Sequence, residues 1–283
     1  MPSRSSSVDN ELIWYAPKPA WSFVDLAELW RYRHLIAILA LRDIKVRYRQ
    51  TMIGVAWALV QPLTQLCIFA LLFGLLGRTP VEPGTPFLVS AMCGLLLWQL
   101  FAQSVTGASA SLLANTNLVT KVYFPRLALP ISAVAVALVD FCVGVGLLAA
   151  LLLWYGVVPG AAILFAPLFV LLAVILAVGI SAWLSALSAL YRDFQYLVPF
   201  LLQIAFFASP VIYQTDALIP AAWRPVFALN PLAGAIEGFR WAVTGQGSPP
   251  WLPIVTSIPL MAVVLGSGLL YFRRVERTFA DRI

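Results

Sequence analysis

Long stretches without any charged residue constrain what this chain can fold into. They cover residues 50–77, 83–120, 127–139, 141–191, 194–215 and 241–272. A helix needs about 20 apolar residues to cross the hydrocarbon core of a bilayer. Only 11% of the residues are charged and 61% are hydrophobic, whereas soluble domains carry roughly 25% charged residues. The sequence therefore predicts an all-α integral membrane protein.

Six membrane-spanning helices fit these stretches. The uncharged run 141–191 has to break once, and the Gly and Pro residues between Tyr155 and Gly160 mark the turn. We place the spans near residues 53–77, 87–110, 127–155, 163–190, 197–214 and 252–272. They define a transmembrane domain over residues 51–272, with a disordered cytoplasmic lead over residues 1–21 and a cytoplasmic tail over residues 273–283.

The basic residues indicate on which side of the membrane the termini lie. Six spans put both termini on one side, and all 18 Lys and Arg residues except Arg78, Arg224 and Arg240 fall in the segments on that side. Because cytoplasmic segments carry the excess of Lys and Arg, we expect both termini in the cytoplasm. The net charge of +6 then reflects orientation and attraction to anionic membrane lipids, and it requires no nucleic acid partner.

Residues 22–50 carry too many charges to span the membrane, but they mix these charges with apolar residues at helical spacing. The apolar stripe consists of Trp30, Ala37, Leu41, Ile44 and Tyr48. This pattern predicts an amphipathic helix in the cytoplasmic interface, with Lys and Arg side chains reaching outward. The alternative is that the basic run serves only as an orientation signal.

The cytoplasmic segment 112–126 combines a turn signal, Asn-Thr-Asn, with an apolar face. Leu118, Val119, Val122 and Tyr123 follow the turn at helical spacing. A helix of this kind can dock a partner protein. A tight interfacial turn is the alternative.

The outward segment 215–245 is too long for a simple loop and too short for two full crossings. Leu232–Thr244 is apolar apart from Glu237 and Arg240, which would share a helix face and be able to pair. We expect re-entrant helices, buried in protein near the outer face. Helices lying flat on the outer surface are the alternative.

The sequence lacks the groups that catalysis or ion coupling inside a membrane would need. The single histidine, His34, lies outside the predicted spans, and Asp140 is the only acidic residue within them. No His, Cys, Asp and Glu cluster suits a metal ion, and no lysine stands in a phosphate-binding Gly-Lys-Ser/Thr sequence. An enzyme or an ion-driven transporter is therefore disfavoured, and the energy for any transport must come from another chain.

Five motifs follow one another along the chain. They are Leu41–Val55 (LRDIKVRYRQTMIGV) with Trp57 and Gln61-Pro62, Asn117–Arg126 (NLVTKVYFPR), Tyr191-Arg192-Asp193, Ser209–Tyr213 (SPVIY), and Asn230-Pro231 followed by Gly238-Phe239-Arg240. In this order they resemble the permease subunits of type-two ABC exporters. Within these the chain looks most like the subgroup that exports O-antigen, capsule and teichoic-acid polysaccharides. The resemblance covers about residues 25–280.

The resemblance implies a homodimer of six-span subunits in the bacterial inner (plasma) membrane, with two cytoplasmic ATPase subunits beneath it. ATP and Mg would bind to those subunits, so this chain would need no cofactor and would not be an enzyme. The dimer would move a lipid-linked polysaccharide from the cytoplasmic to the outer face. A similar exporter for drugs or lipids is the alternative.

The resemblance also implies roles for particular residues. The first and fifth spans would flank a channel between the two permeases, where aromatic rings stack on sugars. The channel candidates are Trp57, Gln61, Phe69, Phe73, Phe206, Phe207 and Tyr213. The helix at 112–126 would couple to the ATPase, and Arg42 and Arg47 would add a charged rim. The candidates on the coupling helix are Leu118, Lys121, Val122, Tyr123 and Arg126.

Overall fold

The computed structural model describes residues 26–49, 56–77, 81, 84 and 86–279, and the regular structure among them is entirely helical. The predicted lead over residues 1–21 lies outside the described residues. The α-helices are α1 (Leu26–Arg31), α2 (Arg33–Arg49), α3 (Trp57–Leu76), α4 (Phe87–Ala114), α5 (Thr116–Lys121), α6 (Ala128–Tyr155), α7 (Ala166–Leu190), α8 (Phe194–Ala208), α9 (Thr215–Leu218), α10 (Arg224–Phe227), α11 (Pro231–Thr244) and α12 (Trp251–Glu276). Two 3₁₀ turns, η2 (Ala161–Phe165) and η3 (Ala221–Trp223), precede α7 and α10.

Among the described residues, five helices are long and apolar enough to cross a membrane: α3, α4, α6, α7 with its preceding turn η2, and α12. The predicted fifth span, 197–214, corresponds to α8, whose 15 residues reach only about 22 Å. Helix α8 ends at Ala208 because Pro210 forces Ser209 into an extended conformation, with ψ at 147°. The count of six spans stays a prediction.

Helix α4 forms the centre of the bundle. All of its residues from Val89 to Phe101 are buried, whereas Pro62 and Leu66 are the only buried side chains among those described on α3. Helices α6, α7, α8 and α11 all pack against α4. The Ser, Ala and Gly residues of α4 allow this, because small side chains let helix backbones approach closely.

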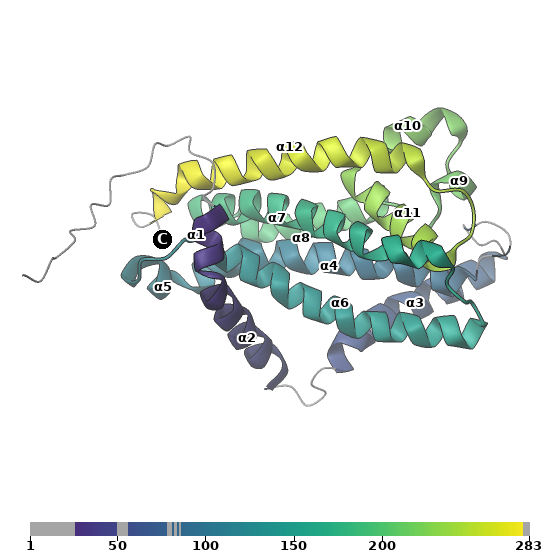
Figure 1. The fold of residues 1–283 in the computed structure, drawn as a ribbon, viewed down its shortest axis with the longest axis horizontal. Coiled ribbons are helices and arrows are strands. Elements are labelled where there is room, and N and C mark those ends of the chain that lie inside the picture. The colour runs from purple at the N-terminus through teal and green to yellow at the C-terminus, as the bar shows by residue number, and fades with distance from the viewer. Residues whose placement is uncertain (1–25, 50–55, 78–80, 82–83, 85, 280–283) are drawn as a thin grey trace, which may run out of the picture.

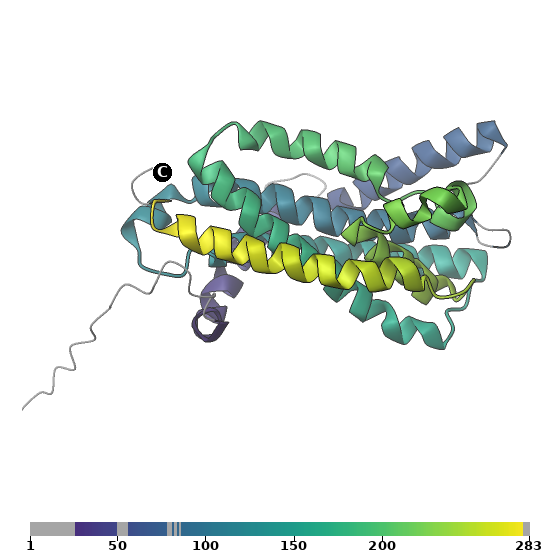
Figure 2. The ribbon, with the colours of Figure 1, turned by 90° about the horizontal axis from the view of Figure 1, so that it is seen from above.

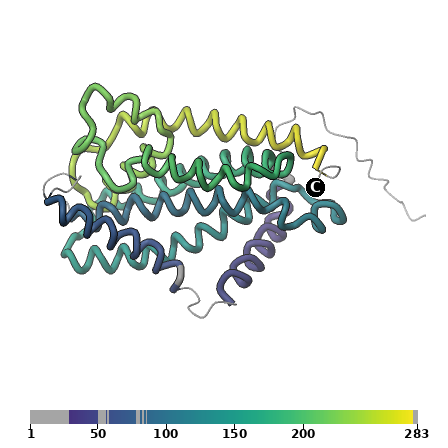
Figure 3. Tube along the Cα trace, turned by 180° about the vertical axis from the view of Figure 1, so that it is seen from behind, coloured from purple at the N-terminus to yellow at the C-terminus, as the bar shows by residue number. Residues whose placement is uncertain are grey.

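The segments predicted to lie on opposite sides of the membrane are found at opposite ends of the bundle. Figure 1 shows α4, α6, α7 and α12 running alongside one another, with α5 and the end of α12 at one end and α9, α10 and α11 at the other. Helix α2 lies at a steep angle to the long helices, as the view from behind also shows (Figure 3).

Glycines set the close packing of α7 on α12. A side chain on Gly268 would overlap the carbonyl oxygen of Gly179, and a Cβ on Gly179 would lie 2.8 Å from the Cα of Leu265. One turn further along, the rings of Trp183 and Tyr271 stack with their centroids 4.3 Å apart. The glycine contacts and the ring stack together hold α12 against α7.

The exposed side chains of the N-terminal helix include part of the predicted apolar stripe. Trp30 and Leu41 are 70% and 54% exposed, as side chains that face a membrane interface would be. Leu39 is buried, in a cluster with Val119, Phe272 and other residues of the bundle. Polar contacts near the end of α2, described below, determine which face points inward. The interfacial position of this helix stays a prediction.

Gly94 gives a test of the packing around α4. A Cβ there would overlap the backbone carbonyl of Val211, which cannot move aside because it also accepts a hydrogen bond from Arg240. We expect Gly94→Ala to destabilise the protein by about 1–3 kcal/mol, as overpacking does, and to lower its melting temperature in detergent. Gly146→Ala is the matched control, because a Cβ added to this helical glycine would have no neighbouring side chain or packed helix within 4 Å. Equal melting temperatures for the two variants would contradict this packing.

Candidate functional site

An ionic cluster joins the end of α2 to α6 and α4. Arg47 Nη1 lies 2.8 Å from Asp140 Oδ2, and Arg47 Nη2 donates to Gln103 Oε1 at 2.7 Å. The hydroxyl of Tyr48 donates to Asp140 Oδ1. The Asp140 side chain is only 7% exposed, and a carboxylate in such a place is costly unless it is paired and hydrogen-bonded. The cluster therefore fixes α2 against the bundle.

Tyr48 remains a hydrogen-bond donor in this cluster. Burial disfavours the phenolate, and the hydrogen bond to Asp140 disfavours it further; together they raise the pKa of Tyr48 from 10.0 to about 12. The hydroxyl is therefore protonated throughout the physiological range. The sequence pointed to Asp140 as an isolated acid but not to its partners, because Tyr48 lies 92 residues away.

The segment predicted to couple to a partner protein contains a shorter helix than expected. Helix α4 continues to Ala114, and α5 covers only Thr116–Lys121 of the predicted 112–126. Val119 and Phe124 are buried and hold the segment to the bundle. Val122 and Tyr123 are 52% and 73% exposed at the end of the bundle, next to the exposed Lys121, and Leu118 is half-buried.

The three arginines predicted for coupling all have partners within the chain. Arg126 donates from its backbone N–H to Glu276 Oε1 at 3.1 Å and from Nη1 to the Glu276 carbonyl, so it ties the α5 segment to the end of α12. Arg42 pairs with Asp43 at 2.7 Å, and Arg47 binds Asp140 as described above. The Arg126 and Arg47 contacts have a positioning role in this structure.

Six of the seven channel candidates lie on two helices along one side of the bundle, and Tyr213 lies in the segment that follows α8. Both α3 and α8 pack on α4, and Figure 2 shows them along the same edge. The rings of Phe69 and Phe206 stack across them at 6.2 Å, while Phe73 meets the edge of Phe87 at 5.3 Å. These rings are half-buried and join α3 to the bundle.

The remaining candidates differ in exposure. Phe207 is 67% exposed and Gln61 is also exposed. Tyr213 is half-buried and donates its hydroxyl to the Phe207 carbonyl at 3.4 Å. The side chain of Trp57 lies outside the described part of the chain.

The structure adds two rings that sequence reasoning missed. Tyr196 is 83% exposed and Phe200 is 58% exposed, and with Gln203 and Phe207 they recur at intervals of four, three and four residues. This spacing places all four on one face of α8. The same periodicity is visible in the sequence. Tyr196 was missed because the predicted span began at residue 197, whereas Phe200 lay within that span and was not singled out.

At the other end of the bundle, Arg240 organises the backbone. Its side chain is buried and donates from Nε to the Ser90 carbonyl at 3.2 Å, from Nη1 to Tyr213 at 3.0 Å, and from Nη2 to Pro210 and Val211 at 2.8 and 2.9 Å. Helix α11 is thereby joined to α4 and to the chain that follows α8.

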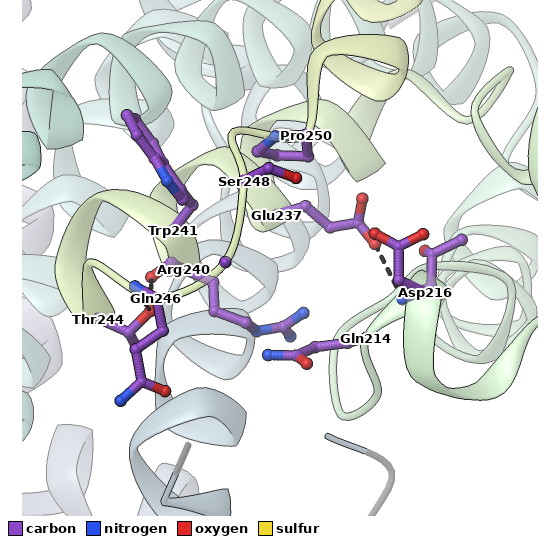
Figure 4. A pocket seen from close by; sticks show the side chains of 11 residues that line it. Gln214, Asp216, Glu237, Arg240, Trp241, Thr244, Gln246, Ser248 and Pro250 are labelled. Carbon is purple, nitrogen blue, oxygen red and sulfur yellow. Dashed lines mark hydrogen bonds between the residues drawn. The ribbon is translucent and has the colours of Figure 1, made fainter. Parts of the chain in front are cut away.

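Glu237 does not pair with Arg240 as predicted. Its Oε1 accepts from the Thr215 backbone N–H at 3.1 Å, and Figure 4 shows its carboxylate directed toward Asp216, away from the guanidinium. Each of the two side chains therefore serves a different backbone segment.

Asn230 begins α11. Its Oδ1 accepts from the Leu232 N–H at 3.0 Å, the capping contact that an Asn-Pro start predicts, and its Nδ2 donates to Ser209 Oγ at 2.8 Å. Among the described residues no group of three His, Cys, Asp or Glu side chains is placed to hold a metal ion.

Residues 34–244, from α2 to the end of α11, match the family described as ABC-2 type transporter. The chain belongs to this family. It is 30% identical over 257 residues to the O-antigen export system permease protein RfbA of Myxococcus xanthus, covering 90% of this chain and 98% of that protein. It is also 29% identical over 249 residues to RfbA proteins of Klebsiella pneumoniae, covering 87% of this chain and 94% of theirs.

Membership of the ABC-2 family accounts for the missing catalytic groups. The chain is a membrane transport component and not itself an enzyme. The matched region includes the ionic cluster around Asp140, the exposed end of the α5 segment, the channel-candidate helices α3 and α8, and Arg240. These four features therefore belong to the part of the chain that the ABC-2 family shares.

A double-mutant cycle tests whether Arg47 and Asp140 hold α2 to the bundle. We expect Arg47→Ala and Asp140→Asn each to lower the free energy of unfolding in detergent, with a coupling of about 1 kcal/mol between them, since Arg47 is half-exposed and its attraction is partly screened. Arg42→Ala with Asp43→Asn, an adjacent pair on the same helix, is the control and should show weaker coupling. Strict additivity of Arg47→Ala and Asp140→Asn would show that the contact does not position α2.

Proposed function

We propose that the chain is the permease of an ATP-driven exporter that moves a lipid-linked polysaccharide, of O-antigen, capsule or teichoic-acid type, from the cytoplasmic to the outer face of the inner membrane. The observation that carries this proposal is the similarity to three O-antigen export permeases over nearly their whole length. The exposed rings on α8 support it, because an aromatic face can stack on any sugar of a polymer.

The working unit is a homodimer of six-span subunits with both termini in the cytoplasm and two ATPase subunits beneath it. Helices α9 to α11 are the re-entrant segment near the outer face. Two observations support this arrangement: the short helix α11 is buried almost throughout, as membrane-depth backbone must be, and the α5 segment lies at the opposite end of the bundle.

The α5 segment docks on the ATPase. Lys121, Val122 and Tyr123 form its exposed end, while Val119 and Phe124 anchor it and Arg126 ties it to α12. A movement of the ATPase would thus reach α12 as well as α4 and α6. Leu118 and Arg42 flank the contact. Arg47 contributes indirectly, because its ion pair with Asp140 holds α2 in position.

We expect Val122→Asp with Tyr123→Asp to abolish copurification of the ATPase, because two carboxylates would be buried at the interface. Val226→Asp, a similarly exposed valine at the opposite end of the bundle, is the matched control and should leave assembly intact. The measurement is copurification from detergent together with ATPase activity, which should require the partner subunit. If the double variant binds the ATPase normally, the segment is only a turn.

The glycan passes along the face formed by α8 and α3. Tyr196, Phe200 and Phe207 offer exposed rings, with the Gln203 amide between them, and Gln61 extends the face on α3. Trp57, in the first turn of α3, is a further candidate. Half-buried rings pack beneath this face and support it: Phe69, Phe73, Phe206 and Tyr213. Stacking holds a sugar in any register, so a polymer can slide without being trapped in one deep site.

We expect Phe200→Ala with Phe207→Ala to reduce surface polysaccharide several-fold while assembly and ATPase activity persist. Trp154→Ala, which removes an 85% exposed ring at the end of α6, is the control for loss of any exposed aromatic side chain. Surface glycan is measured on cells that carry each variant as the only copy. Normal surface glycan after complete deletion of the chain would favour the second candidate function, export of a drug or lipid.

A further inference from the structure

A polar cleft lies at the same end of the bundle as α9 and α11. Figure 4 shows it from close by. Gln214 and Asp216 line it from the chain around α9, Glu237 and Arg240 from α11, and Gln246 and Ser248 from the loop that leads to α12. None of these groups is used by the ATPase contact or by the aromatic face of α8, so the cleft requires its own explanation.

The two charged side chains at the base of the cleft are held rigidly. A guanidinium has five N–H groups, and Arg240 uses four of them on the carbonyls of Ser90, Pro210, Val211 and Tyr213. One Nη1–H remains. Glu237 is fixed through Oε1 by the Thr215 N–H, which leaves Oε2 as an acceptor. A donor and an acceptor therefore both line the cleft, and each is fixed by its own hydrogen bonds.

The charges of the lining disfavour an ionic ligand. An anion such as phosphate would meet the carboxylates of Asp216 and Glu237. A metal cation would meet the guanidinium of Arg240, and Asp216 is already paired with Arg224 at 2.7 Å. A neutral ligand with many hydroxyl groups meets neither penalty, because each hydroxyl both donates and accepts. The hydroxyl of Ser248 offers a further group that can donate and accept.

We propose that this cleft is a sugar-binding subsite, in which two adjacent hydroxyls of a pyranose bind Glu237 Oε2 and the remaining Nη1–H of Arg240. The inference rests on the proposed function: the subsite would hold one unit of the polysaccharide where it leaves the bundle at the outer end. It adds to the aromatic face a place where hydroxyl groups, rather than the flat faces of the sugar, are recognised.

The test uses the full chain in lipid nanodiscs and saturation-transfer NMR with the methyl glycosides of mannose, rhamnose, glucose and N-acetylglucosamine. At least one glycoside should receive saturation on its ring protons. Ser248→Leu, on an exposed loop, should fill the cleft and abolish the transfer. Glu237→Gln should weaken binding about tenfold through loss of a charge-assisted hydrogen bond. Ala221→Leu, exposed and outside the cleft, is the matched control and should bind as the wild type does.

The other outcomes overturn the subsite. They are the absence of transfer to any of the four glycosides, equal transfer to wild type and Ser248→Leu, or displacement of the glycoside by phosphate, Mg²⁺ or Ca²⁺, which would identify an ion site. Deletion of the chain separates this inference from the proposed function. If deletion removes surface glycan but no glycoside binds, the exporter stands without the subsite. If glycosides bind but deletion leaves surface glycan normal, the sugar site stands and the export function falls.

Discussion

The guanidinium of Arg240 is the constraint on which the end of the bundle around α9 and α11 depends. A buried cation costs several kcal/mol unless its donors are paired, and this one is 2% exposed with bonds to four backbone carbonyls. Three of these carbonyls belong to residues 210–213, which follow the end of α8 and have no helix to satisfy them. One side chain thus satisfies an irregular segment and fixes it to α4 and α11.

The small residues around Arg240 follow from this arrangement. Gly94 has no side chain, so the Val211 carbonyl can lie directly against α4. On the opposite side, Gly234 lies against Pro253 and donates its N–H to Ser257 Oγ at 3.2 Å, which brings α11 onto α12. Helix α11 is therefore held by backbone contacts on two sides. A helix of 14 residues, too short to cross a bilayer, can in this way be buried almost throughout.

The features that neighbouring residues determine could be predicted from the sequence. Charge-free runs located the long helices, and Asn230-Pro231 located the start of α11, because both depend on neighbouring residues alone. The contacts that orient these helices join distant residues: Arg47 to Asp140, Arg126 to Glu276 and Arg240 to Ser90. No periodicity encodes such pairs, so the sequence did not show how α2 is held to the bundle or that Arg126 bonds to Glu276. The stripe from Tyr196 to Phe207 was encoded locally, but Tyr196 preceded the predicted span and Phe200 was not singled out within it.

Both charged clusters are attached to the same helix. Gln103 of α4 binds Arg47 at one level, Ser90 of α4 accepts from Arg240 at another, and the two lie about 20 Å apart at 1.5 Å per residue. Moving α4 would break both clusters and expose the buried run from Val89 to Phe101. Helices α3 and α8 are restrained less, since each packs on the bundle through one side and leaves its other face exposed. Their polar ties are the Gln99–Gln65 hydrogen bond between α4 and α3 and the bonds of Arg240 to the residues that follow α8. If the proposed glycan path opens and closes, it disrupts the fewest contacts when α3 and α8 move against a fixed α4. Helix α2, held at Asp140 and preceding α3 in the chain, would then convey that movement from the end of the bundle that carries α5.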